Sequence, residues 1–160
     1  MVRTPAARLA LIAILPLTLI MRPCSASAAL GGSVTTVDAD RVHMQGALMR
    51  IVQTGPFALH EIRSPSGTMI REYVNSSGTV FAVAWDGPWL PDLRQVLGDH
   101  FDRYQTAMQR RQGAARTGRG ALVIDEAGIV VQMSGHPRAF TGRAYLPGHL
   151  PAGVQLASIR

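Results

Sequence analysis

The sequence predicts an α+β fold in which an antiparallel sheet of about five to six strands packs against two main helices. Three strand-like runs joined by four-residue turns indicate the sheet, and a later hairpin pattern extends it. Two stretches with apolar residues at helical spacing supply the helices. The order of one helix, three strands, a second helix and two or three further strands is typical of helices packed on an antiparallel sheet.

The first predicted helix spans residues 34–52 and follows a flexible lead at 29–33. Apolar residues recur in it every three or four positions. Thr35 followed by Asp38 resembles a capping box at the start of the helix. Gly46 lies in its interior and lowers the stability of the helix by about 1 kcal/mol.

Three strand-like runs follow at 57–63, 68–74 and 79–85. The tetrapeptides between them, 64–67 and 75–78, begin with Ser or Asn and end with Gly, as type I turns prefer. Connections this short make the three strands antiparallel neighbours.

The third run, at 79–85, is apolar on both faces, so we expect a central strand that is covered on both sides. Alternation along a strand divides its side chains into two sets. The larger set is Phe81, Val83 and Trp85, and the smaller set is Val80, Ala82 and Ala84. We expect a helix to pack closely on the face with the smaller residues.

Two prolines in the segment 86–91 end this strand, because proline cannot donate a hydrogen bond to a sheet. A helix is predicted at 92–111, and Gly98 is expected to split it into two shorter helices. The remaining segments are an Arg/Gly-rich loop at 112–120, a hairpin at 121–134 with its turn at 125–128, a strand at 139–146 and a loop-like tail at 147–160.

The first 28 residues have the pattern of a secretory signal peptide. Arg3 and Arg8 precede an apolar run at 9–21, and an A-x-A segment follows at 26–28. The apolar run is shorter than the roughly 18 residues that a transmembrane helix needs. We expect cleavage after residue 28, export to the periplasm or the extracellular space, and no stable membrane span in the mature chain.

The mature chain, residues 29–160, is predicted to be a single domain without a disulfide. Cys24 is the only cysteine of the chain and precedes the cleavage site. Lipidation of Cys24 is the alternative, although Arg22 and Pro23 are not the residues that a bacterial lipobox has at those positions. All 16 basic residues are Arg, and three of them precede residue 29, which leaves 13 against 10 acidic residues. This small excess gives little reason to expect binding to nucleic acid.

Residues 71–85 (REYVNSSGTVFAVAW) and 87–93 (GPWLPDL), with Leu97, Gly98 and Phe101, resemble a family of small exported bacterial proteins. His60-Glu61 and Ser66-Gly67-Thr68 fit the same pattern. The family is known as domain of unknown function 2844. The resemblance extends over nearly all of the mature chain and implies export and one domain. The family has no established activity, ligand, cofactor or catalytic residues, so the resemblance implies none here.

The sequence contains no motif of a known catalytic or metal site. The five histidines (His43, His60, His100, His136 and His149) show no zinc-ligand spacing, so we expect no metal and no cofactor. The motifs of serine hydrolases are absent as well. A pair of carboxylates suffices for a hydrolase of polysaccharides, and the candidates are Glu61, Glu72, Asp86 and Asp92. No catalytic residue is assigned.

Two groups of residues are candidates for binding. The first surrounds the junction of strand and helix, where Trp89 and Trp85 flank Asp86, with Asp92 nearby. Trp89 lies in a loop and offers a flat apolar surface to a sugar or a peptide, whereas Trp85 is expected in the core. The second group is Arg110, Arg111, Arg116 and Arg119, which can hold phosphate or carboxylate groups or simply form a solvated loop.

These observations favour an exported, non-enzymatic protein that binds an envelope polymer or a partner protein. The alternative is a small cell-wall or polysaccharide hydrolase that uses two of the four carboxylates. A purely structural role is a third hypothesis. The sequence does not indicate an oligomeric state.

Overall fold

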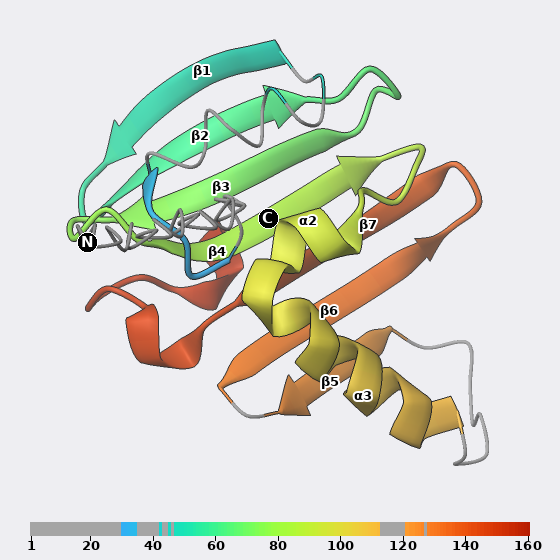
Figure 1. The fold of residues 1–160 in the computed structure, drawn as a ribbon. Helices are drawn as coiled ribbons and strands as arrows, with labels where there is room; N and C mark the ends of the chain where they lie inside the picture. The colour runs from blue at the N-terminus through green and yellow to red at the C-terminus, as the bar shows by residue number, and fades with distance from the viewer. Residues whose placement is uncertain (1–29, 35–41, 43–44, 46, 113–120, 127) are drawn as a thin grey trace, which may run out of the picture.

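The computed structural model describes residues 30–160 except 35–41, 43–44, 46, 113–120 and 127. Its main element is a seven-stranded antiparallel sheet with the strand order β1-β2-β3-β4-β7-β6-β5 (Figure 1). The strands are β1 (Ala47–Thr54), β2 (Phe57–Arg63), β3 (Met69–Asn75), β4 (Val80–Gly87), β5 (Leu122–Glu126), β6 (Ile129–His136) and β7 (Ala139–Tyr145).

The three predicted central strands and their turns are confirmed. In the first turn the Gly67 N–H donates to the Ser64 carbonyl at 2.9 Å, and in the second the Gly78 N–H donates to the Asn75 carbonyl at 2.9 Å. Both glycines have a positive φ, which side chains other than glycine rarely adopt. The Asn75 side chain also accepts a hydrogen bond from the Thr79 N–H at 3.0 Å, which fixes the register of β3 and β4.

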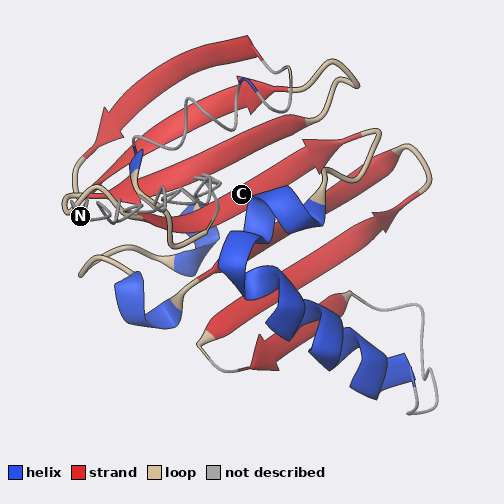
Figure 2. Ribbon diagram, viewed as in Figure 1, coloured by secondary structure: helices blue, strands red, loops and turns tan. Residues whose placement is uncertain are grey.

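The helical structure between 93 and 112 consists of α2 (Leu93–Leu97), a 3₁₀ turn η1 (Gly98–His100) and α3 (Phe101–Gln112). Asp92 caps α2, since its carboxylate accepts from two backbone N–H groups of the first turn. Gly98, with φ of 49°, ends α2 and confirms the predicted break. These helices lie on one face of the sheet (Figure 2).

The predicted fold class is wrong in two respects. The sheet has seven strands rather than five or six, and within the described residues one interrupted helical segment stands where two main helices were expected. The error begins in the predicted helix at 34–52, because residues 47–54 form strand β1. This strand pairs with β2 along its length and lies at the edge of the sheet, so its side chains show little of the alternation that marks a half-buried strand. Residues 35–41, 43–44 and 46 of that prediction lie outside the described residues.

Each face of the sheet carries its own apolar cluster, and β4 contributes to both. Trp85 and Val83 pack with residues of α2 and α3 on one face. Ala82 and Ala84 pack on the other face with Ile159, near the C-terminus. Strand β4 is therefore central and buried on both sides, as predicted.

The predicted division of β4 is wrong at two points. The register of β3 and β4 shifts by one residue between Tyr73 and Val74. Phe81 therefore lies on the face with Ala82, and Val80 lies on the face with Trp85, so both residues exchange their predicted faces. The helices cover the face with Trp85, and the C-terminal tail, rather than a helix, covers the face with the alanines.

The tail from residue 147 contains two short 3₁₀ turns, η2 (Pro147–His149) and η3 (Leu156–Ser158). Ile159 is fully buried, and the Arg160 N–H donates to the Tyr73 hydroxyl at 3.1 Å. The tail is therefore a covering layer of the sheet.

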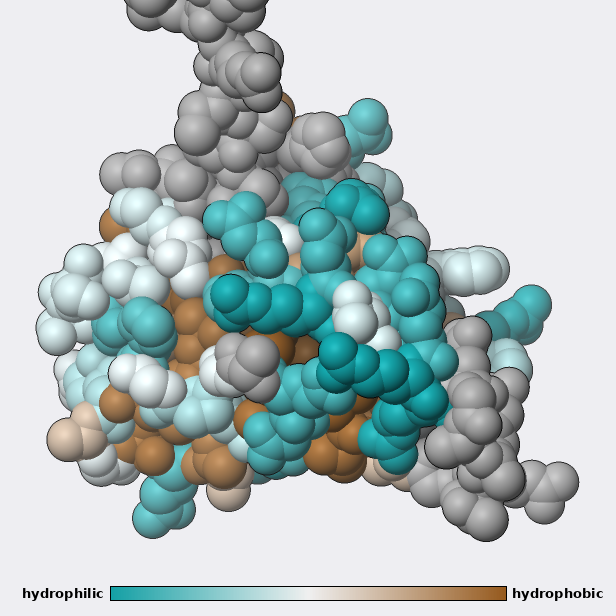
Figure 3. All heavy atoms as spheres, turned by 60° about the horizontal axis from the view of Figure 1, so that its bottom comes forward, coloured by the Kyte–Doolittle hydropathy of each residue, from teal (hydrophilic) through white to brown (hydrophobic). Residues whose placement is uncertain are grey.

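Figure 3 turns the lower edge of Figure 1 towards the reader, and hydrophilic residues gather there over the side that carries α3.

Several predictions fall on residues that the structure does not describe. The signal peptide at 1–28 with Cys24, the lead residue 29, and most of the Arg/Gly-rich loop with Arg116 and Arg119 lie outside the described residues. Among the residues that are described, none belongs to a helix long and apolar enough to cross a bilayer.

Candidate functional site

The corner between β4 and α2 separates the two tryptophans of the chain. Trp85 ends the apolar part of β4 and is 1% exposed, whereas Trp89, four residues later, is 60% exposed. Strand periodicity predicted the burial of Trp85, and this is confirmed. The large exposed surface of Trp89 makes it the part of the corner that is accessible to a partner.

Thr68 holds the loop that carries Trp89. Its hydroxyl donates to the Trp89 carbonyl at 2.7 Å and accepts from the Trp89 N–H at 3.4 Å, and Thr68 itself is 1% exposed. Gly87 lies so close that a Cβ there would be 2.5 Å from the Thr68 Cα. The backbone that carries the exposed indole is therefore held by Thr68, a buried residue that follows the turn at 64–67.

A cavity of about 310 Å³ opens beside this loop. Leu90, which is exposed like its neighbour Trp89, contributes to its wall. Strands β5, β6 and β7, with Ala121 directly before β5, supply the rest. Its other apolar lining side chains are Ala121, Leu122, Met133 and Phe140, and its polar ones are Ser134 and Thr141. Trp89, Leu90 and this cavity together form what we call the Trp89 ledge.

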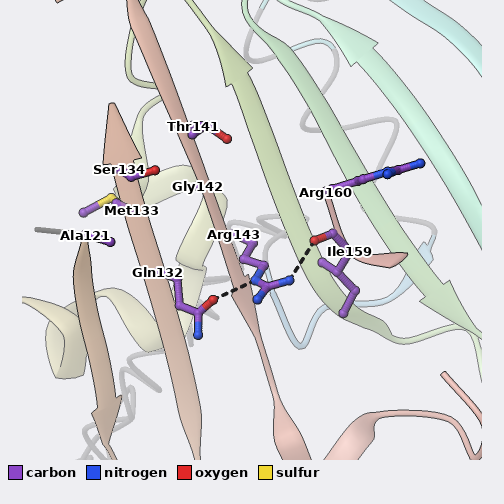
Figure 4. A pocket seen from close by; sticks show the side chains of 9 residues that line it. All are labelled: Ala121, Gln132, Met133, Ser134, Thr141, Gly142, Arg143, Ile159 and Arg160. Atoms are coloured by element: carbon purple, nitrogen blue, oxygen red, sulfur yellow. Dashed lines mark hydrogen bonds between the residues drawn. The ribbon is translucent and has the colours of Figure 1, made fainter. Parts of the chain in front are cut away.

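A second cavity, of about 270 Å³, shares four lining residues with the first and is lined by Arg143, Ile159 and Arg160 as well. The Arg143 side chain reaches from β7 between Gln132 and the tail (Figure 4). Its Nε donates to the Gln132 Oε1 at 2.8 Å and its Nη1 to the Ile159 carbonyl at 3.1 Å. These contacts give Arg143 a structural role, because they tie the tail to the sheet.

Residues 26–159 match the sequence model of a family described as Protein of unknown function (DUF2844). The chain belongs to this family. The match includes the corner and both tryptophans of this DUF2844 protein, and all the lining residues of the two cavities except Arg160. The chain has no match among curated proteins and none among solved structures.

The structure gives the four candidate carboxylates of this DUF2844 protein different surroundings. Glu61 and Glu72 lie on opposite faces of the sheet, because Glu61 is directly across from Arg71, the neighbour of Glu72 in β3. Asp92 is occupied in capping α2, and Asp86 is exposed at the end of β4. None of the described cavities has a carboxylate in its lining.

Glu61 is held between two arginines of the neighbouring strands. Arg50 Nε lies 2.6 Å from one carboxylate oxygen and Arg71 Nε lies 3.1 Å from the other. Burial by itself would raise the pKa of Glu61, but the hydrogen bonds and charges of Arg71 and Arg50 outweigh it, so the pKa is lowered. An ionised, doubly paired carboxylate is unsuited to act as a general acid.

The two described arginines of the predicted basic group have local partners. Arg110 forms an ion pair with Glu126 at 3.0 Å, and Arg111 donates to the Val123 carbonyl. Both contacts join the end of α3 to strand β5. This arrangement favours a structural role for these two residues over the binding of an anionic polymer.

Sequence reasoning missed two arrangements of histidines. His60 lies directly across from Glu72 on the neighbouring strand, and both are buried on the face that carries the helices. His100 and His149, far apart in the sequence, line one cavity together with Arg103. No spacing rule predicts either arrangement, because sheet register and the path of the tail create them. Within the described residues no group of three His, Cys, Asp or Glu side chains is placed to hold a metal ion.

Proposed function

We propose that this DUF2844 protein is an exported, non-enzymatic binding protein whose Trp89 ledge receives an apolar side chain of a partner protein in the cell envelope. The observation that carries the proposal is an indole with 60% exposure on a loop whose backbone is hydrogen-bonded to a buried threonine. Tryptophan is enriched among the residues that dominate the energy of protein interfaces.

The fixed loop favours binding because little conformational entropy is lost when a partner docks on it. Leu90, the chain neighbour of Trp89, lines the cavity, where Phe140 and Met133 provide further apolar wall. A volume of about 310 Å³ is sufficient for one large apolar side chain with its neighbouring backbone.

The composition of the ledge favours a protein over an envelope polysaccharide. A glycan site combines aromatic stacking with several polar groups that bind hydroxyls, and the side chains lining this cavity include only two, Ser134 and Thr141. The carboxylates Asp86 and Asp92 add few hydrogen-bond acceptors for sugar hydroxyls, since the Asp92 carboxylate already caps α2. A polysaccharide ligand is retained as an outcome of the test.

Export is proposed from the sequence alone, on the basis of the leader pattern at 1–28. N-terminal sequencing of the protein isolated from its native host tests this part. A first residue at Ala29 supports cleavage of a signal peptide, whereas a chain beginning at Met1, or acyl chains on Cys24, contradicts it.

The binding site is tested by photo-crosslinking in the native host. A photoreactive phenylalanine analogue is placed at residue 89 and, as a matched control, at Val123, another exposed apolar residue. We expect one specific protein adduct at position 89 and none of the same protein at position 123. The identified partner, once purified, should bind the Leu90→Asp variant at least about tenfold more weakly than the unmodified chain.

Two results would contradict the proposal. One is the same adduct at both positions, which indicates chance collision. The other is unchanged affinity of the purified partner for the Leu90→Asp variant. Crosslinking at position 89 to a polysaccharide alone would show that the ledge binds a glycan rather than a partner protein.

A further inference from the structure

A cavity of about 350 Å³ gathers three basic side chains from three segments of the chain. His100 comes from η1, Arg103 from α3 and His149 from η2. It shares no lining residue with the Trp89 ledge. The remaining lining residues are Gly31, Gly128, Leu146 and Gly148.

The lining contains no acidic residue, and Arg103 supplies its permanently charged group. Asp99, the neighbour of His100, is exposed to solvent and is the carboxylate that acts on the His100 ring. Two of the glycines leave the space open, because a Cβ at Gly128 or at Gly148 would meet no atom within 4 Å. A ligand can therefore approach the backbone at Gly128 and Gly148.

His100 is held in the wall of the cavity with part of its hydrogen-bonding capacity unused. Its Nδ1 is buried and finds no partner among the residues that the structure describes. Its Nε2 faces the N-terminal lead, where a Cβ at Gly31 would be only 3.1 Å away. Burial lowers the pKa of His100, Arg103 and His149 lower it further, and Asp99 opposes them.

The side chains of the cavity favour an anion over a metal ion. Zinc requires three or four convergent ligand atoms, and this cavity offers two imidazoles beside a guanidinium that repels cations. An oxyanion, in contrast, is attracted by the guanidinium and can accept hydrogen bonds from imidazole N–H groups, and arginine matches the geometry of phosphate oxygens well. A tetrahedral phosphate can accept hydrogen bonds from three directions, which suits donors that come from three segments.

We propose that the cavity between His100, Arg103 and His149 is a binding site for a phosphate group, carried either by a lipid headgroup or by a free phosphate. The bound anion favours the protonated form of His100. Affinity should accordingly rise as the pH falls and His100 gains a proton, and decline as His100 loses that proton. The groups that set this dependence are Asp99, Arg103 and His149, which act on His100.

The experiment is a titration of the purified protein with inorganic phosphate, followed by NMR of the histidine imidazoles at pH 6 and pH 8. We expect the signals of His100 and His149 to shift with saturation at pH 6, those of His136 to stay unchanged, and binding to be weaker at pH 8. The Arg103→Gln variant should bind phosphate about tenfold more weakly at pH 6. Arg94→Gln is the matched control, because Arg94 stacks on the Phe101 ring outside the cavity.

Vesicles of phosphatidylglycerol, compared with phosphatidylcholine vesicles of the same size, distinguish the two sources of phosphate. Binding to the anionic vesicles that is lost in Arg103→Gln and kept in Arg94→Gln, without a response to inorganic phosphate, supports the lipid headgroup. A response to inorganic phosphate with the same dependence on the variants supports free phosphate. Equal losses in both variants, or no response of either histidine in the native chain to any of these probes, would overturn the proposal.

Discussion

Trp85 and Trp89 are four residues apart and have opposite environments. Trp85 belongs to the apolar cluster under the helices, and Trp89 projects from the next loop into solvent. The burial of Trp85 follows from its place on a central strand. The exposure of Trp89 follows from two prolines that end the sheet and from Thr68, which holds the loop outward. One corner of the fold thus combines a residue that maintains the core with a residue that is exposed to a partner.

The largest effect is expected for Trp85→Ala. Removing a buried indole loses apolar contacts and leaves a cavity, which should lower the free energy of unfolding by about 3–5 kcal/mol. Urea denaturation followed by circular dichroism measures this change. Trp85→Phe is the control: because the Trp85 Nε1 has no hydrogen-bond partner among the described residues, the smaller ring should lower the stability much less.

Gly142→Ala tests how closely the core is packed around Trp85. Gly142 is directly across from Trp85 in β7, and a Cβ there would lie 2.4 Å from the Trp85 ring. We expect a loss of about 1–3 kcal/mol in the free energy of unfolding. Gly148→Ala, where a Cβ meets nothing within 4 Å, should change stability little, and equal effects of the two variants would show that Trp85 does not pack as described.

Thr68→Val tests the support of the loop with Trp89. The substitution retains the shape of the side chain but removes the hydroxyl that bonds both backbone groups of Trp89. We expect a loss of about 1–2 kcal/mol. Acrylamide quenching in a Trp85→Phe background should show a change in the surroundings of Trp89, and an unchanged quenching curve would mean that the loop is held by other contacts.

Asp92→Ala separates a capping role from a binding role at this corner. The variant loses the hydrogen bonds to the Arg94 and Gln95 N–H groups, which should cost about 1 kcal/mol. Asp92→Asn retains a side-chain acceptor and should restore most of the stability. Both variants should bind the partner as tightly as the unmodified chain does. Weaker binding by both variants would place the Asp92 carboxylate in the binding site.

The sequence predicted the parts of this fold that are controlled by local rules. Turn residues fixed the hairpins at 64–67 and 75–78, and Gly98 marked the break between α2 and α3. Strand β1 was not predictable in the same way, because an edge strand acquires its structure from pairing with β2 rather than from its own pattern. The face reached by Phe81 depends on a register shift that leaves no local signal.

The candidate sites show the same limit. Periodicity placed Trp85 in the core, but the exposure of Trp89 depends on a contact with Thr68, 21 residues earlier. The cavity with His100 and His149 exists because the tail returns to the start of α3 after β7. Contacts of this kind are set by the tertiary structure, so a search for spaced motifs could not find them.

The most direct test of the account measures stability and binding on one variant, Trp89→Ala. Because the indole is largely exposed, the free energy of unfolding should change by less than about 0.5 kcal/mol. Affinity for the partner identified by crosslinking, measured by calorimetry, should fall at least about tenfold. A large loss of stability with unchanged affinity would contradict the account and make Trp89 a second structural residue.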